Sequence, residues 1–231
     1  MKTIEEGSIT AKKGFQNEDF VVQKFNSWQQ DLDAQQWLQI MNYCLNEIES
    51  VKAEKISGHY KADIQVQVSI KLKTCIDVEN LQVKLVSNKN GFNQIDKRWV
   101  DKYTELWNIP NDISTLLKQY TGEILPQGKT KDKRRTFANE FDESKQRLLL
   151  DWLEKNKIMI VSDIFKGRGR FAAEWMLVIR KTSNSNEWVL KPINETINFF
   201  GNGMVSITSR GNISIGKITM QRKGGDGGRD T

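Results

Sequence analysis

The sequence predicts a single α/β domain whose central sheet is mixed but largely antiparallel. Apolar residues recur at helical spacing near the N-terminus and again in the middle of the chain. From residue 64 onward, and through most of the last third, apolar and polar residues alternate as they do in strands with one buried face. No internal repeat and no clean linker divides the 231 residues, which favours one domain.

The helical segments are predicted from the spacing of their apolar positions. Val21 and Phe25 place the first helix within residues 15–31. Asp33 is the predicted N-cap of the second helix, whose apolar face would reach Ile48. Further helices are predicted around residues 99–107, 113–120, 144–155 and 193–200.

Strands are predicted where the apolar period falls to two. Residues 64–72 and 81–85 alternate strictly, but Ile76 and Val78 are apolar at even positions whereas the later apolar residues are odd. This phase shift near Asn80 predicts a β-bulge or a fresh strand start. Later strands are predicted in the segments IMIVSDIF, AAEWMLVIRK, EWVLK, GMVSITS and NISIGKITM.

Composition excludes several kinds of site. One histidine and two cysteines cannot build a tetrahedral Cys/His zinc site, and Cys44 and Cys75 are expected to be reduced packing residues. No stretch approaches the roughly 20 apolar residues of a membrane span, and the N-terminus lacks the apolar core of a signal peptide. A cytosolic protein without a membrane partner is therefore expected, and its net charge of +6 favours an anionic partner.

A hairpin turning near Thr74 would pair the two central strands. The one-residue slip near Asn80 would bring Asp63 roughly opposite Lys84, and residues opposite each other in a ladder point to the same side. Gln82, two residues before Lys84, shares that face. Asp63, Gln82 and Lys84 are therefore expected to converge.

These three side chains suit phosphodiester hydrolysis. That reaction needs charge stabilisation at the phosphate, a metal ion that makes hydroxide available near neutral pH, and a group that orients the attacking water. Side-chain oxygens of Asp63 and Gln82 and the backbone carbonyl of Val83 are ligands that Mg²⁺ accepts, and Lys84 lies beside them. The same pattern is common in surface strands, and on the residues alone that alternative stays open.

The spacing resembles a known signature. Eighteen residues, 64 to 81, separate Asp63 from the run Gln82-Val83-Lys84, which resembles SD-x18-QxK, a variant of the PD-(D/E)xK signature of type II restriction endonucleases. The segments VKLVSNKNGFNQIDK, TKDKRR, DWLEKN, GRGRFAAEW and QRKGGD are similar to those of HinP-type restriction endonucleases. The similarity covers essentially the whole chain.

The resemblance implies a restriction-endonuclease-like fold in one domain. Its N-terminal helices and catalytic hairpin would occupy residues 1–110, a helical and basic segment 111–157, and a strand-rich part 158–231. It implies Mg²⁺-dependent cleavage of double-stranded DNA at GCGC, after the first G, to leave a two-base 5′ overhang. It further implies a bacterial, cytoplasmic enzyme that is a monomer or weak dimer and is paired with a cognate DNA methyltransferase.

The resemblance also assigns roles in the site. Asp63 and Gln82 would bind Mg²⁺ together with the Val83 carbonyl. Lys84 would position or activate the attacking water.

Two departures from the commoner pattern affect this site. Ala62 stands where the family has serine, which removes a hydroxyl but no ligand charge. Gln82 in place of glutamate leaves the site one negative charge short, and hard dications prefer charged oxygen ligands. Glu18 on the first helix is the candidate that would restore the charge, and an exposed helix glutamate is the alternative.

DNA contacts are predicted in two loops and a basic segment. In the resembling enzymes the loop GFNQIDK meets the DNA with an aromatic wedge, and QRKGGD offers base-reading side chains beside glycines that allow close approach. The candidates for base contacts are Phe92, Asn93, Gln94, Lys97, Gln221, Arg222, Lys223 and Asp226. The candidates for phosphate contacts are Lys131, Arg134, Arg135 and Arg168. The alternatives are a core phenylalanine, a floppy basic tail and solvated surface charge.

Two other functions stay open on the sequence. One is a structure-selective DNA repair nuclease with the same metal core. The other is a DNA-binding protein whose nuclease fold has lost catalysis, for which Gln82 and Ala62 are the only hints.

Overall fold

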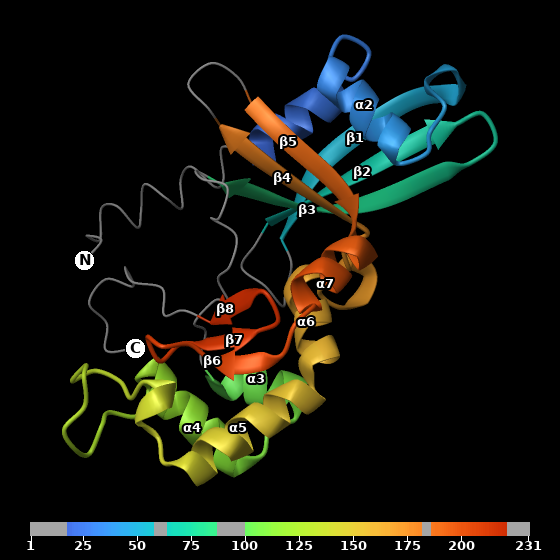
Figure 1. The fold of residues 1–231 in the computed structure, drawn as a ribbon. Helices are drawn as coiled ribbons and strands as arrows, with labels where there is room; N and C mark the ends of the chain where they lie inside the picture. The colour runs from blue at the N-terminus through green and yellow to red at the C-terminus, as the bar shows by residue number, and fades with distance from the viewer. Residues whose placement is uncertain (1–17, 58–63, 87–99, 182–185, 221–231) are drawn as a thin grey trace. The chain divides into compact units, whose positions relative to one another are not determined.

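A computed structural model of the chain describes residues 18–57, 64–86, 100–181 and 186–220 (Figure 1). These residues belong to two compact units. The sheet unit takes the described residues between 9 and 92 and between 165 and 197, and the helical unit takes the others. Because each unit is assembled from separate stretches of the chain, no single linker divides them. One domain, with parts at 1–110, 111–157 and 158–231, stays a prediction.

The sheet unit is built on a five-stranded sheet in the order β1-β2-β3-β4-β5. Neighbouring strands are antiparallel except β3 and β4, which are parallel. The predicted α/β class with a mixed, largely antiparallel sheet is therefore confirmed. The strands are β1 (Ile48–Ser57), β2 (Ile64–Leu72), β3 (Ile76–Val86), β4 (Trp175–Lys181) and β5 (Asn186–Pro192).

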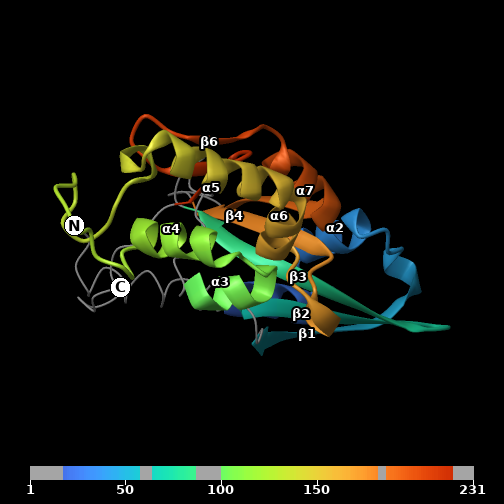
Figure 2. The ribbon, with the colours of Figure 1, turned by 90° about the horizontal axis from the view of Figure 1, so that it is seen from below.

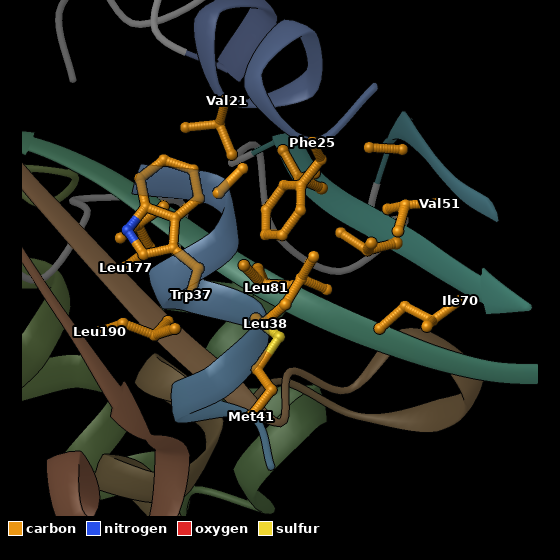
Figure 3. Close-up of a cluster of buried hydrophobic side chains, with 14 of the residues drawn as sticks. Val21, Phe25, Trp37, Leu38, Met41, Val51, Ile70, Leu81, Leu177 and Leu190 are labelled. Atoms are coloured by element: carbon orange, nitrogen blue, oxygen red, sulfur yellow. The ribbon is translucent and has the colours of Figure 1, made fainter. Parts of the chain in front are cut away.

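Two helices cover one face of this sheet with apolar side chains (Figures 1 and 3). They are the helix over residues 18–26 and α2 (Leu32–Ile40). The rings of Phe25 and Trp37 lie 5.2 Å apart, and Trp37 meets Trp188 of β5 edge to face at 5.7 Å. Burying each such side chain contributes roughly 1.5–3 kcal/mol. This core fixes which face of each strand is apolar.

The second helix is capped by Asp31 and not by the predicted Asp33. The Asp31 Oδ1 atom accepts a hydrogen bond from the Ala34 N–H at 3.0 Å. Asp33 instead accepts from the Trp188 indole N–H at 2.8 Å and from Lys24 Nζ at 2.9 Å. The prediction was wrong because either aspartate suits an N-cap, and the partner that occupies Asp33 comes from a distant strand.

The second helix is also shorter than predicted. It ends at Ile40, close to Asn42, whose φ of 69° is incompatible with continued helix. A 3₁₀ turn, η1 (Leu45–Glu47), leads into β1 at Ile48. Cys44 lies in this connection and, like Cys75, is free but exposed, so the expected packing role of the two thiols is wrong.

The predicted bulge near Asn80 is also wrong. β3 runs without a break and pairs with β2 in one register over all the pairs that the structure describes. The apolar residues Ile76 and Val78 break phase because they are 63% and 45% exposed, on the face opposite Leu81. A register shift does occur, but between β1 and β2 near Ile48.

The segment IMIVSDIF forms most of helix α6 (Lys157–Phe165) and not the predicted strand. Within this segment Ile160 and Val161 are fully buried, while Ile158 is 79% exposed. An apolar run of this length does not distinguish a buried strand from a helix by periodicity alone. Whether such a run forms a helix or a strand is decided by its packing against the rest of the protein.

The helical unit packs helices against a small antiparallel sheet in the order β6-β7-β8. Figure 2 shows α3 and α4 side by side, and the Thr104 and Ser114 hydroxyls join them by a hydrogen bond of 2.9 Å. The elements are α3 (Val100–Trp107), α4 (Asn111–Thr121), η2 (Ala138–Glu140), α5 (Glu143–Lys155), β6 (Val205–Ile207), β7 (Ile213–Ile215) and β8 (Ile218–Met220). By chain connectivity α6 and α7 (Ile193–Gly201) pass from one unit to the other. Among the described helices, none combines the length and the apolar character that a membrane span requires.

Tyr120 links α4 to the small sheet. Its hydroxyl donates to the Met220 carbonyl at 2.6 Å and accepts from the Ile213 N–H at 3.3 Å. The side chain is 1% exposed, and burial raises the pKa of the hydroxyl, which stays a hydrogen-bond donor.

We expect Tyr120→Phe to lower the free energy of unfolding by about 1–3 kcal/mol. The substitution leaves the Met220 carbonyl and the Ile213 N–H without their partner, next to a buried ring. Tyr43→Phe is the comparison. Tyr43 is half-buried and donates to Glu79 at 2.8 Å, and the lost bond leaves an acceptor that retains the Trp175 indole N–H. Urea unfolding of both variants measures the difference, and equal losses would contradict the role of Tyr120.

Candidate active site

The β2–β3 hairpin is where the sequence predicts catalysis. The Leu72 N–H donates to the Cys75 carbonyl at 2.9 Å, which places the turn at the predicted position near Thr74. From there the ladder runs in one register to the pair of Gln65 with Gln82. The face on which each β3 side chain lies is therefore fixed by its position in the strand.

β3 is a central strand with an apolar face and a polar face. Leu81 and Val83 enter the apolar core. Gln82 lies between them, points to the opposite face, and is only 2% exposed. Lys84 follows two residues later on the same face and is half-buried. The alternation that predicts a shared face for Gln82 and Lys84 is thus matched by the strand.

The Gln82 side chain has an unpartnered oxygen. Its Oε1 atom is buried and accepts no hydrogen bond within the described part of the chain, and the same is true of Oε1 of Gln65, directly across the ladder. Two adjacent carboxamides can satisfy one another, but neither donates an N–H to the other's oxygen. Each buried acceptor left unpaired costs about 1–3 kcal/mol.

Asn80, two residues before Gln82, shows the opposite behaviour. Its Oδ1 atom accepts from Gln67 Nε2 at 3.0 Å, and its Nδ2 atom donates to the Arg170 carbonyl at 3.3 Å and the Ala172 carbonyl at 3.4 Å. Asn80 is 6% exposed and fully engaged. It ties the polar face of β3 to the segment that precedes β4.

A pair of glutamates lies beside this anchor. Glu79 accepts from the Tyr43 hydroxyl at 2.8 Å and from the Trp175 indole N–H at 2.9 Å, while Glu174 accepts from the Asn80 backbone N–H at 3.0 Å. Partial removal of the Glu174 carboxyl from water raises its pKa, and the Glu79 carboxylate raises it further, against the lowering effect of the Asn80 N–H. These contacts hold β3 and the start of β4 in place.

The donor set fits a hard divalent cation. Such ions take oxygen ligands, and the two buried carboxamide oxygens of Gln65 and Gln82 face no competing donor in the described structure. Within the described ranges no group of three Asp, Glu, His or Cys side chains gathers. The carboxylate that the sequence predicts for this site is Asp63.

Many predicted site residues cannot be placed. Val83 is described, and it pairs with Leu177 of β4. The residues that lie outside the described ranges are Ala62, Asp63, Phe92, Asn93, Gln94, Lys97, Gln221, Arg222, Lys223 and Asp226.

Glu18 is the first described residue of the N-terminal helix. Val21 and Phe25 of the same helix enter the apolar core, so the helix lies on the face of the sheet that Leu81 and Val83 share. The Glu18 side chain is half-buried, with one carboxylate oxygen shielded from water. It is therefore not the exposed helix glutamate of the alternative, and its catalytic role stays a prediction.

The predicted phosphate-binding residues differ in their surroundings. Lys131 is exposed and its Nζ atom donates to Asn139 at 3.3 Å, and Arg134 is exposed and paired with Asp132 at 3.1 Å. Arg168 is exposed just before η3 (Gly169–Phe171).

Arg135 is half-buried, with its guanidinium stacked 4.2 Å from the Phe137 ring centre and 5.8 Å from that of Tyr120. Cation–π contacts of this kind hold the side chain in the helical unit. Arg135 thus differs from Lys131, Arg134 and Arg168, which are exposed.

Gln65 and Asn80 are not among the site residues predicted from sequence. The predicted register does contain a signal for Gln65, because placing Asp63 opposite Lys84 also places Gln65 opposite Gln82. No comparable signal exists for Asn80, since its partners at Arg170 and Ala172 lie about 90 residues away in the chain.

Comparison with known families identifies the family of the chain. Residues 41–231 match the family described as R.HinP1I restriction endonuclease. The match includes the whole β2–β3 hairpin and every predicted site residue except Glu18. No curated protein sequence matches the chain. The matched region takes in most of the chain, which therefore belongs to the R.HinP1I restriction endonuclease family, whose members are nucleases that bind double-stranded DNA.

Proposed function

We propose that the chain is a Mg²⁺-dependent type II restriction endonuclease that hydrolyses phosphodiester bonds in double-stranded DNA at GCGC. It cuts after the first G and leaves a two-base 5′ overhang. The family match over residues 41–231 carries this proposal, because it includes the hairpin on which Gln82 and Lys84 share one face. The specificity rests on the sequence resemblance to HinP-type enzymes.

The proposed site follows the PD-(D/E)xK pattern in its SD-x18-QxK form. Asp63, Gln82 and the backbone carbonyl of Val83 hold the cation. If the β2–β3 register continues two positions beyond the pair of Gln65 with Gln82, Asp63 stands opposite Lys84. The unpartnered Gln82 oxygen supports its place among the ligands.

The protein groups divide the chemistry between them. A bound Mg²⁺ supplies positive charge at the phosphate and lowers the pKa of an attacking water. Lys84 donates hydrogen bonds that orient this water and the phosphate oxygens, from a half-buried position that limits competition from bulk solvent. Glu18 is proposed to add the negative charge that neutral Gln82 does not provide, although its helix covers the face of the sheet opposite to Gln82.

DNA recognition is proposed to use the two loops and the basic residues. Base contacts come from the segments around Phe92 and Arg222. Phosphate contacts come from Lys131, Arg134 and Arg168, which are exposed and able to exchange their present partners for phosphate. Arg135 is proposed instead to stabilise this region by stacking its guanidinium on the Phe137 ring.

The biological setting follows from the activity. A nuclease that cuts a four-base sequence requires a cognate DNA methyltransferase to protect the host, and both would work in the bacterial cytoplasm. The enzyme is proposed to act as a monomer or weak dimer.

The first test is digestion of unmethylated plasmid. We expect discrete fragments with Mg²⁺, none with a chelator, and sequenced ends that map to GCGC with two-base 5′ overhangs. A smear would indicate a repair or non-specific nuclease. Intact plasmid together with a gel shift would indicate a DNA-binding protein without catalysis.

Lys84→Ala should reduce the cleavage rate by at least about 100-fold, because it removes the group that orients the water. Binding to the same duplex, measured by gel shift, should persist. Lys52→Ala on β1, where the lysine is 79% exposed, is the matched loss of one positive charge and should cleave at the wild-type rate. Near wild-type cleavage by Lys84→Ala would remove this lysine from the site.

A further inference from the structure

Gln65 has the same unusual environment as Gln82, although the proposed function gives it no role. The two residues are directly opposed across the β2–β3 ladder, so their side chains lie on one face with Cβ atoms about 5 Å apart. Both Oε1 atoms are shielded from water and lack a hydrogen-bond partner within the described structure. Two buried acceptors without a partner therefore belong to side chains that are neighbours on one face of the hairpin.

The next polar pair along the ladder shows that the fold does not force the Gln65 and Gln82 oxygens to stay unpaired. Gln67 and Asn80 are also opposed across β2 and β3, on the same face as Gln65 and Gln82. There the Gln67 N–H donates to the Asn80 oxygen at 3.0 Å. Two carboxamides in this geometry are thus able to pair, yet Gln65 and Gln82 leave both oxygens unpaired.

An arrangement that costs stability and is not required by the backbone is expected at functional sites. Neighbouring acceptor oxygens that are buried without a donor favour a positive charge beside them. A structural role would be served better by a pair like Gln67 and Asn80. A cation or its bound water would satisfy both oxygens at once.

We propose that Gln65 supplies a second carboxamide oxygen to the divalent-cation site, beside Gln82. The proposal rests on the proposed function for the identity of the cation as Mg²⁺. It makes Gln65 part of the cation's environment, either in direct contact or through one of the ion's waters. Gln65 then helps to compensate for the missing carboxylate at position 82 by adding a neutral oxygen ligand.

The test compares Gln65→Met with Gln67→Met. Methionine keeps the length of glutamine and removes the carboxamide, and the two sites share a strand and a face. For Gln65→Met we expect the Mg²⁺ concentration that gives half-maximal plasmid cleavage to rise by about 10- to 100-fold, the usual effect of removing a group near a bound metal. Gln67→Met should leave this concentration unchanged. Gln65→Glu should lower it, because a carboxylate binds Mg²⁺ more strongly than a carboxamide.

The melting temperature without Mg²⁺ supplies a second readout that does not depend on catalysis. Gln65→Met removes an unpaired buried oxygen and should melt higher by about 2–4 °C, whereas Gln67→Met breaks a hydrogen bond and should melt lower by a similar amount. Added Mg²⁺ or Mn²⁺ should raise the melting temperature of the wild type more than that of Gln65→Met.

The outcomes separate this proposal from the proposed function. If the wild type cleaves DNA and Gln65→Met shows the same Mg²⁺ dependence, the role of Gln65 is overturned. If Gln65→Met melts lower than the wild type and responds to Mg²⁺ as the wild type does, the glutamine is structural. A third outcome is that the wild type fails to cleave DNA while Mg²⁺ still raises its melting temperature more than that of Gln65→Met. In that case the proposed function fails and the cation site stands.

Discussion

The register of β3 between its two neighbours is the constraint on which the rest of the structure depends. Leu81 and Val83 must face the helices that carry Phe25 and Trp37, because the apolar core has no other way to close over the centre of the sheet. A slip of one residue would move Gln82 into that core and expose leucine on the polar side. The apolar packing on one face therefore fixes the polar side chains on the other.

The polar face of β3 changes character along its length. At Asn80 every polar atom of the side chain is engaged, and the bonds reach both β2 and the segment before β4. At Gln82, two residues further, the oxygen is buried and unpaired. The hydrogen bonds of Asn80 thus hold the backbone of β3 in place beside Gln82. This limits the movement by which the Gln82 oxygen could reach a donor. This is how a strand can hold ligand atoms ready at a cost in stability.

The alternation of residues was sufficient to predict β2, the hairpin turn near Thr74 and the shared face of Gln82 and Lys84, because strand periodicity depends only on local sequence. It wrongly predicted a break in β3 near Asn80, since it could not show that Ile76 and Val78 are exposed. That IMIVSDIF forms a helix was not predictable, since the burial of Ile160 and the exposure of Ile158 depend on tertiary packing. Likewise Asp33 lost the capping role to Asp31 because Trp188 approaches it from β5. Whether a glutamine oxygen finds a donor is also decided by elements far along the chain, so the pairing state of Gln65 had no sequence signal.

Under the proposed function, the use of carboxamides has a consequence for coupling between metal and DNA. Neutral oxygens balance none of the charge of a divalent cation, and the positive charge of Lys84 offsets part of the negative charge that Asp63 and Glu18 are proposed to bring. The DNA phosphates are the anions that a nuclease brings to this place, so cation and DNA each bind more tightly in the presence of the other. The linkage is reciprocal: whatever free energy the duplex adds to cation binding, the cation adds to duplex binding. A neutral residue at position 82 therefore favours an enzyme that assembles its full cation site only on DNA, where the charge needed to hold the ion is present.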